Sequence, residues 1–243
     1  MYMTGNKMVI GFLGLGRLGF PCALATASKG HRVVGWDISE TVREQITTGD
    51  VPYKEALVHE LLAENSIEFK RMEEMVAMCD IIFVPIQTPH DTAYDGKTRV
   101  PFRRVDFDYE PLRRGLIELA DEAARQERRP IVSVISTVLP GTMQREILPY
   151  LCDNLRICYN PFFIAQGTTV YDFLHPEFIL LGVDDDEAAD TVRGFYSTIT
   201  DAPCRRMSIA SAECTKVLYN TAITSKIRRA NDAARLCDVH GRA

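Results

Sequence analysis

The sequence predicts an α/β protein: a doubly wound, mostly parallel sheet, followed by a long helix that begins a second, helical domain. Three observations predict this fold. Short apolar runs alternate with helical stretches, as strands and crossover helices do in a parallel sheet. A glycine-rich turn directly follows the first apolar run. A long stretch near the C-terminus contains neither glycine nor proline, which is typical of one continuous helix.

The first elements lie on either side of the glycine-rich turn. Residues 8–13 are apolar throughout, which is typical of a strand buried on both faces. Residues 20–29 are mostly small and predict a helix that stops at Gly30. A second strand is expected over residues 31–36 and ends at Asp37.

The same alternation continues along the chain. Two helices are expected over residues 40–48 and 53–64, separated by a Gly-Asp-Val-Pro turn. Later strands are expected over 80–85, 131–135, 154–159 and 178–183, with a helix over 112–127. The connection over 88–108 is long enough to be a lid or binding loop.

The C-terminal helix is expected over residues 210–236 and is long for a globular protein. We therefore expect one domain over 1–207 and the start of a second, helical domain over 208–243. Apolar side chains recur along this helix and should be buried against a partner. They are Val217, Leu218, Ile223 and Ile227.

Composition limits the function classes. The 243 residues are 46% hydrophobic, enough for a substantial core, and carry a formal net charge of -5, which argues against a nucleic-acid partner. No apolar run approaches the roughly 20 residues of a membrane span, and residues 1–8 do not resemble a secretory signal. The seven scattered cysteines form no CxxC pair, and no histidine has metal-ligand spacing. These features favour a cytoplasmic protein without a structural metal.

Residues 14–19 (GLGRLG) form a GxGxxG pattern between a strand and a helix, the Rossmann dinucleotide-binding fingerprint. Gly14 permits the tight turn, Gly16 lets a pyrophosphate approach the backbone, and Gly19 allows close helix packing. Asp37 follows at the spacing of an acid that binds the adenosine ribose, and its charge would repel a 2′-phosphate. The pattern predicts NAD rather than NADP; the alternative is a plain glycine-rich turn beside a surface aspartate.

Four later segments resemble, in order, motifs of the UDP-glucose/GDP-mannose dehydrogenase family. They are VPIQTP at 84–89, STVLPGT at 136–142, YNPFFIAQG at 159–167, and AECTK at 212–216 followed by Asn220, Lys226 and Asn231. The resemblance covers almost the whole chain. It implies that residues 1–207 form an NAD-binding domain and that residues 208–243 begin a helical dimerisation domain. Because the corresponding helix lies at the dimer core in the family, the resemblance also implies a homodimer through the 210–236 helix. Hydroxyacid and 6-phosphogluconate dehydrogenases share such a fold, but these segments favour the nucleotide-sugar family.

The resemblance implies oxidation of the C6 alcohol of a UDP- or GDP-sugar to a uronic acid for polysaccharide biosynthesis. In the family, hydride passes twice to NAD, and a cysteine holds the intermediate as a thioester. Lys216 would stabilise the reacting oxygen, Asn220 would hold the same oxygen or a water, and Thr137 would position water or cofactor. Without the resemblance, Lys216 and Asn220 would be a solvated helix face, and Ser136 and Thr137 plain turn residues.

The implied contacts fall into two sets. The cofactor set adds to the glycines and Asp37 the residues Arg17, Leu18, Thr88, Pro89, Ser136, Thr137 and Gln166. The substrate set is Asn160, Phe162, Phe163, Lys216 and Asn220.

The chain departs from the family pattern in two ways. Phe162 and Gln166 stand where the family has two glutamates, and Ala165 replaces a basic residue. Phenylalanine cannot transfer a proton, which affects the hydrolytic half-reaction. No cysteine lies in the glycine-rich context of the family's nucleophile. We therefore expect that the sequence is either a fragment or a naturally short protein. Two alternatives therefore remain open: an oxidoreductase that stops at an aldehyde or ketone, and a non-catalytic NAD-binding subunit.

Overall fold

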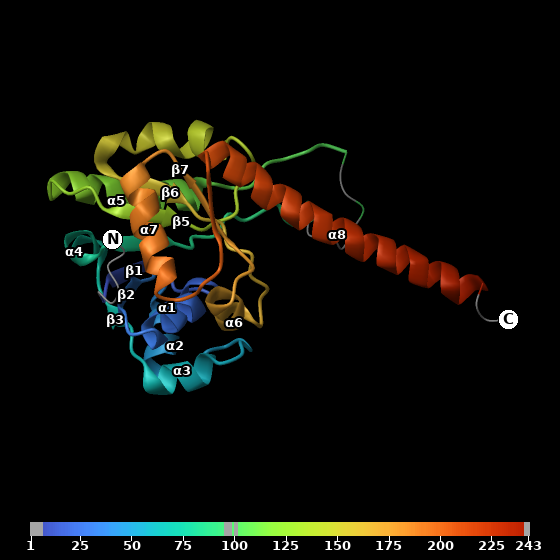
Figure 1. The fold of residues 1–243 in the computed structure, drawn as a ribbon, viewed down its shortest axis with the longest axis horizontal. Coiled ribbons are helices and arrows are strands. Elements are labelled where there is room, and N and C mark those ends of the chain that lie inside the picture. The colour runs from blue at the N-terminus through green and yellow to red at the C-terminus, as the bar shows by residue number, and fades with distance from the viewer. Residues whose placement is uncertain (1–6, 95–98, 100–101, 241–243) are drawn as a thin grey trace.

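An eight-stranded sheet lies between two layers of helices in the computed structural model, which describes residues 7–94, 99 and 102–240 (Figure 1). The strands are β1 (Val9–Leu13), β2 (Arg32–Trp36), β3 (Glu68–Phe69), β4 (Ile81–Val84), β5 (Ile131–Val134), β6 (Arg156–Tyr159), β7 (Ile179–Val183) and β8 (Cys204–Met207). Their spatial order is β3-β2-β1-β4-β5-β6-β7-β8. All neighbouring strands pair in parallel except β6 and β7, which are antiparallel.

This order confirms the predicted doubly wound sheet. The chain moves outward from β1 through β2 to β3, then crosses back and continues from β4 on the other side of β1. The crossover leaves a switch point between β1 and β4, where ligands of such folds bind beyond the carboxyl ends of the strands. The candidate site should therefore be sought at that edge.

The central strands are apolar because both of their faces are buried. Ile10 and Phe12 of β1 belong to the core on one side of the sheet, whereas Leu13 belongs to the core on the other. The same alternation places Phe83 of β4 on the first side and Val84 on the second. These runs lack the polar–apolar alternation of a half-exposed strand because neither face meets water.

Helices cover both faces of the sheet. They are α1 (Gly19–Ser28), α2 (Glu40–Thr48), α3 (Val58–Glu64), α4 (Met72–Met78), α5 (Glu110–Arg125), α6 (Thr169–Leu174), α7 (Asp186–Ser197) and α8 (Ile209–His240). Short helical turns follow at Thr92–Tyr94, Met143–Ile147, Leu148–Tyr150 and Cys152–Asn154. Helices α1, α3, α6 and α7 contribute to one core, and α4, α5 and the first turn of α8 to the other.

The predicted boundaries agree with the structure within two residues for most elements. The predicted start of one helix is wrong: the sequence predicts a helix over 53–64, but the helix begins at Val58. Residues 53–57 are irregular, and Leu57 adopts a left-handed conformation with φ 68°. The reason is tertiary, since Glu55 is bound to a distant loop. The predicted binding loop over 88–108 lies partly outside the described residues, and its described part contains the turn Thr92–Tyr94.

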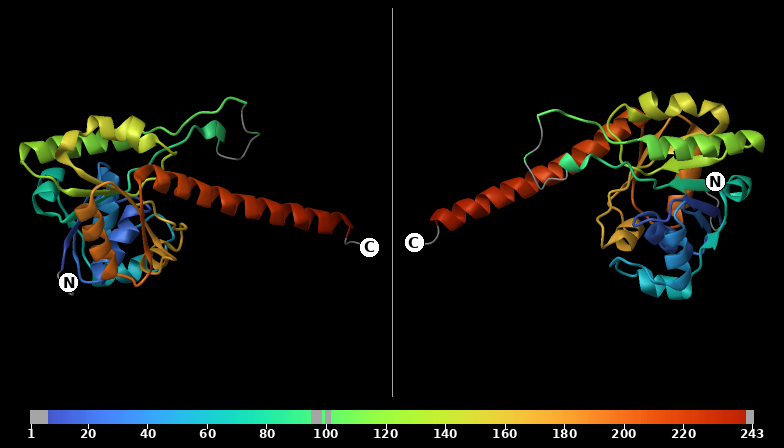
Figure 2. Two further views of the ribbon diagram at one scale, coloured as in Figure 1. Left: turned by 45° about the horizontal axis from the view of Figure 1, so that its top comes forward. Right: turned by 180° about the vertical axis from the view of Figure 1, so that it is seen from behind.

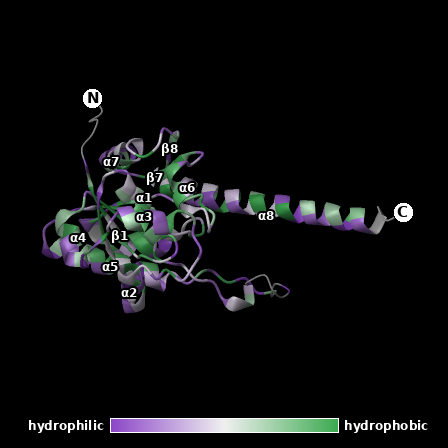
Figure 3. Ribbon diagram, turned by 90° about the horizontal axis from the view of Figure 1, so that it is seen from below, coloured by the Kyte–Doolittle hydropathy of each residue, from purple (hydrophilic) through white to green (hydrophobic). Residues whose placement is uncertain are grey.

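Helix α8 leaves the sheet after its first turns. Gly182 of β7 permits its close approach, because a Cβ added there would lie 2.7 Å from the Cβ of Ala212. The rest of α8 projects away from the domain, as three views show (Figures 1 and 2). Apolar residues recur along the projecting part (Figure 3), and Leu218, Ile223 and Ile227 are exposed there. Among the described residues, none of the helices has the length and apolar character needed to cross a bilayer.

Candidate functional site

The fingerprint turn between β1 and α1 is shaped by its three glycines. Gly14 has φ +117°, and its N–H donates to the Trp36 carbonyl at 2.7 Å, which fixes the turn against the end of β2. A Cβ on Gly19 would lie 2.1 Å from the Gly14 carbonyl oxygen, so only glycine fits there. A Cβ on Gly16 would meet no atom within 4 Å, which leaves the backbone open to a ligand. The residue at the N-cap position of α1, Leu18, makes no side-chain hydrogen bond to the amino end of the helix.

Asp37 lies directly beside this turn, half-buried at the end of β2. Its Oδ2 accepts a hydrogen bond from the Leu15 N–H at 2.8 Å, and its Oδ1 accepts one from the Ser39 N–H at 2.9 Å. Each carboxylate oxygen has a second acceptor site, so the carboxylate can also receive two ribose hydroxyls. The predicted pairing of glycine turn and acid is thus present in the structure.

Arg43 is a residue of this region that the sequence analysis missed. Its guanidinium lies 4.4 Å from the centroid of the Trp36 ring and donates to the Asp37 carbonyl. The only local signal was its place six residues after Asp37, on the helix that Ser39 caps. It brings a cation next to Asp37.

A cleft opens between the fingerprint turn and α2. Gly16 and Arg17 line it together with α2 and with Val51, Pro52 and Tyr53. The Arg17 guanidinium lies 5.6 Å from the centroid of the Tyr53 ring. The irregular segment after α2 therefore lines the same cleft as the fingerprint turn. The prediction of a helix over 53–64 did not indicate this.

The loops after β4 and β5 are bound to each other. Thr88 donates its hydroxyl to the Thr137 carbonyl at 2.7 Å, and Ser136 donates to the carbonyl of Ile86. Pro89 is exposed, and its carbonyl accepts from the Asp108 N–H at 2.8 Å. Two strand ends that are far apart in sequence thus present Thr88 and Thr137 together, next to the β1 end.

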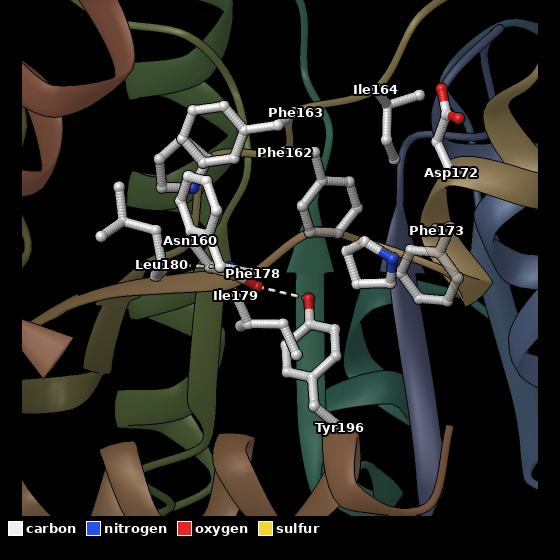
Figure 4. Close-up of a pocket in the computed structure, with 12 residues that line it drawn as sticks. Asn160, Phe162, Phe163, Ile164, Asp172, Phe173, Phe178, Ile179, Leu180 and Tyr196 are labelled. Atoms are coloured by element: carbon white, nitrogen blue, oxygen red, sulfur yellow. Dashed lines mark hydrogen bonds between the residues drawn. The ribbon is translucent and has the colours of Figure 1, made fainter. Parts of the chain in front are cut away.

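The loop after β6 carries Asn160, Phe162, Phe163 and Gln166. Asn160 is buried, and its amide is used within the protein: Nδ2 donates to the Leu180 carbonyl at 2.9 Å, and Oδ1 accepts from the Tyr196 hydroxyl (Figure 4). Its polar atoms anchor the start of the loop to β7 and α7. Gln166, farther along the loop, is exposed.

The two phenylalanines of this loop lie in separate aromatic groups (Figure 4). The Phe162 ring centroid is 6.2 Å from that of Phe83 and 5.5 Å from that of Phe173. The Phe163 ring centroid lies 4.7 Å from that of Phe178 and 4.6 Å from that of Tyr219 on α8. The Phe162 side chain therefore occupies an apolar setting that an ionised carboxylate would not favour.

Lys216 reaches back from α8 to this loop and is 6% exposed. Its Nζ donates to the Phe162 carbonyl at 2.7 Å and to the Asn220 Oδ1 at 3.2 Å. The ammonium also lies 4.8 Å from the centroid of the Phe163 ring. Lys216 and Asn220 lie on one helix face, as their spacing predicted, but Lys216 is buried rather than solvated.

Glu213, one turn earlier on α8, is a second residue whose role the sequence did not reveal. It is 1% exposed, and its carboxylate accepts from the Gly141 N–H at 2.6 Å and the Met143 N–H at 2.7 Å. It therefore binds the lysine-bearing helix to the turn that follows Thr137. This contact links segments 70 and 72 residues apart.

The Lys216 ammonium should give the protein a characteristic alkaline pH dependence. Burial lowers the pKa of Lys216 to about 8, below its ordinary value of 10.5. Between these two pH values the unfolded chain binds more protons than the folded chain, so the free energy of unfolding rises with pH. We expect wild type to gain up to about 3 kcal/mol relative to Lys216→Met over this interval.

Urea unfolding at pH 7, 8.5 and 10 checks this prediction. Lys226→Met is the matched control, because Lys226 lies on the exposed part of α8 and its removal should leave the pH dependence unchanged. Parallel stability curves for wild type and Lys216→Met would show that the ammonium is not destabilised by burial.

Within the described ranges, no group of three or more histidine, cysteine, aspartate or glutamate side chains is placed to hold a metal ion. The described features instead meet at one edge of the sheet. The fingerprint turn, Asp37, the linked Thr88 and Thr137 loops and the loop bound by Lys216 all follow the carboxyl ends of parallel strands. Such an edge can hold a dinucleotide and place a buried cation near its far end.

Comparisons with known proteins agree with this geometry. Residues 8–200 match the NAD binding domain of the UDP-glucose/GDP-mannose dehydrogenase family. The chain is 29% identical to the UDP-glucose 6-dehydrogenase AglM of Haloferax volcanii, an alignment of 96% of this chain and 55% of that protein. It is also 29% identical to a GDP-mannose 6-dehydrogenase of Pseudomonas syringae, over 96% of this chain and 54% of that protein. The chain spans about half the length of these relatives.

Solved structures give the same result. The GDP-mannose dehydrogenase of Pseudomonas aeruginosa superposes with a TM-score of 0.81 and 26% identity, covering 91% of this chain and 51% of that one. The UDP-glucose dehydrogenase of Pyrobaculum islandicum superposes with a TM-score of 0.81 and 27% identity, covering 96% and 54%. The prediction of NAD as cofactor is confirmed by the domain match. The chain belongs to the UDP-glucose/GDP-mannose dehydrogenase family, and residues 8–200 match its NAD-binding domain.

Proposed function

We propose that this chain is the NAD-binding portion of a nucleotide-sugar dehydrogenase that oxidises the C6 alcohol of a UDP- or GDP-sugar toward the uronic acid, a reaction that supplies polysaccharide biosynthesis. The observation that carries the proposal is the meeting of the glycine turn with Asp37 and the Lys216 loop at one sheet edge. The relatives named above are UDP-glucose and GDP-mannose 6-dehydrogenases.

The residues at the fingerprint fit NAD. The open space above Gly16 and the uncapped start of α1 suit a pyrophosphate, which Arg17 and Leu18 would flank. Asp37 would hold the adenosine ribose, and Thr88, Pro89, Ser136, Thr137 and Gln166 would line the remaining length. When bound, NAD accepts a hydride from the substrate carbon.

On the substrate side, Lys216 would hold the substrate hydroxyl and stabilise the negative charge that develops on its oxygen. Asn220 accepts from Lys216 and so aims the ammonium, and Thr137 would position water or the cofactor. Phe163 packs beneath the ammonium, and Asn160 and Phe162 hold the loop in place. These residues would form this chain's share of the active site.

A second candidate reaction is favoured by one observation. Phe162 lies among aromatic rings, where the family has an acid that assists hydrolysis. An enzyme without that acid would stop at the aldehyde or ketone and release one NADH per substrate. Two NADH and a carboxylate product would rule this out. The third reading, a non-catalytic NAD-binding subunit, would require NADH binding with no turnover of any nucleotide sugar.

We further propose that residues 1–207 form the NAD-binding domain, that 208–243 begin a helical domain, and that two copies associate through the 210–236 helix. The exposed Leu218, Ile223, Ile227 and Leu236 on the projecting helix support a partner there. A cytoplasmic location is consistent with the free cysteines found among the described residues. The negative net charge favours no nucleic-acid partner.

Replacing Asp37 tests the cofactor assignment. Asp37→Ala should weaken NADH binding by about 10- to 100-fold, because the ribose loses hydrogen bonds to a charged acceptor. It should also reduce the preference for NADH over NADPH, because the negative charge facing a 2′-phosphate is gone. NADH fluorescence titration measures both affinities.

The control is Asp184→Ala, an exposed aspartate after β7 and away from the cofactor edge. It should bind NADH as wild type does. An unchanged affinity for Asp37→Ala, with thermal unfolding showing an intact fold, would refute the fingerprint assignment.

A further inference from the structure

Glu55 is a buried carboxylate that the proposed chemistry does not use. It is 9% exposed and accepts three hydrogen bonds from the loop after β6. The donors are the Gly167 N–H at 2.8 Å, the Thr169 N–H at 2.5 Å and the Thr169 hydroxyl at 3.0 Å. The neighbouring Ala56 N–H donates to the Gly167 carbonyl at 3.2 Å. Glu55 therefore holds two segments together across 112–114 residues of sequence.

Both segments border the cofactor edge. Residues 51–53, just before Glu55, line the cleft that contains Gly16 and Arg17 of the fingerprint turn. Gln166, just before Gly167, is the exposed residue proposed to contact NAD. The contact thus joins the segment that lines this cleft to the loop that carries Gln166.

The backbone around this contact is held against its local preference. Leu57, two residues after Glu55, has φ 68°, a conformation that L-residues other than glycine, asparagine and aspartate rarely adopt. Gly167 has φ +99°, which brings its N–H toward the carboxylate. The conformation of Leu57 persists only where the surrounding contacts determine it, whereas glycine adopts a positive φ without strain.

We propose that Glu55 is a positioning residue of the NAD site: its carboxylate fixes the loop of residues 165–169, and with it Gln166, at the distance from the fingerprint turn that the cofactor requires. The inference rests on the proposed function, because it assigns Gln166 to the cofactor. With Glu55 in place the loop is ordered before NAD arrives, so binding does not bear the entropic cost of ordering it.

The role differs from ordinary core packing. Helix α6, which Thr169 begins, is already attached to the core through the buried side chains of Val170 and Phe173. An apolar residue at position 55 would suffice to fill space. A carboxylate that accepts from two backbone N–H groups instead specifies where the loop backbone lies.

A double-mutant cycle on NADH affinity tests the proposal. In Glu55→Gln, one acceptor oxygen becomes an NH2 group that faces backbone donors, so we expect about tenfold weaker NADH binding. If Glu55 acts through Gln166, Glu55→Gln combined with Gln166→Ala should bind NADH no more weakly than the weaker single variant. Additive losses would show that the two residues act independently and would overturn the proposal.

Asp185→Asn is the structural control. Asp185 also accepts from a backbone N–H, that of Ala188, and binds Arg156 at the opposite edge of the sheet. The variant Asp185→Asn should lower the thermal stability of the protein without weakening NADH binding. If Glu55→Gln behaved in the same way, its role would be structural only.

A milder variant keeps the test decisive if Glu55→Gln does not fold. Thr169→Val removes only the hydroxyl donor and should weaken NADH binding about threefold. Wild-type affinity in Thr169→Val would then overturn the proposal. Failure of the wild-type chain to bind NADH would instead refute the proposed function, so the two failures are distinguishable.

Discussion

Gly16→Val is expected to fold normally and to lose NADH binding by at least about 100-fold. A Cβ at position 16 meets no atom of the described residues within 4 Å, and the position is exposed, so the side chain would start into open space. It would instead occupy the space through which a pyrophosphate approaches the start of α1. NADH titration together with thermal unfolding measures the two effects separately.

Gly194→Ala on α7 provides the matched control. A Cβ there also meets nothing within 4 Å, but the residue lies in a helix away from the fingerprint turn. This variant should bind NADH normally and be slightly more stable, because alanine favours the helix. Normal NADH binding by Gly16→Val would mean that the cofactor does not approach this turn.

The central fold was predictable because its signals are local. The strand over 8–13 and the GLGRLG turn are contiguous in sequence, and burial of both faces makes β1 a continuous apolar run. Strand β8 was not predictable in this way. Its residues Arg205 and Arg206 are exposed at the sheet edge, so the strand lacks the apolar pattern of the central strands.

The candidate site was predictable only in part, because its contacts join distant segments. The pairing of the glycine turn with Asp37 follows from a spacing typical of many dinucleotide-binding proteins, and in the structure the Leu15 N–H donates to Asp37. Nothing in the sequence near Glu55 indicates that it binds Gly167 and Thr169, and the local pattern predicts a helix over this residue. Lys216 was predicted as a site residue only from the family resemblance, because a lysine followed four residues later by asparagine does not by itself indicate a function.

Gly19→Ala should damage the fold itself. A Cβ at position 19 would lie 2.1 Å from the Gly14 carbonyl oxygen and 2.7 Å from Cγ of Pro85. Neither atom can move easily: the first belongs to the fingerprint backbone and the second to a proline ring at the end of β4. The start of α1 must therefore shift away from β1 and β4. We expect a loss of about 3 kcal/mol, which corresponds to a fall in Tm of roughly 6–12 °C.

Gly115→Ala is the control for Gly19→Ala, because its added Cβ would clash with a flexible side chain and not with the backbone. A Cβ at Gly115 on α5 would lie 2.5 Å from Cδ1 of Ile86, which is the end of a flexible side chain. Ile86 can change rotamer, and alanine favours the helix interior by about 1 kcal/mol, so the Tm should change little. Equal melting temperatures for the two variants would mean that the fingerprint backbone adapts to a Cβ. Then close packing of α1 on the turn would not be what requires glycine at position 19. A much lower Tm for Gly19→Ala than for Gly115→Ala would mean that folding requires glycine at position 19. Cofactor binding, in contrast, would be what requires glycine at position 16.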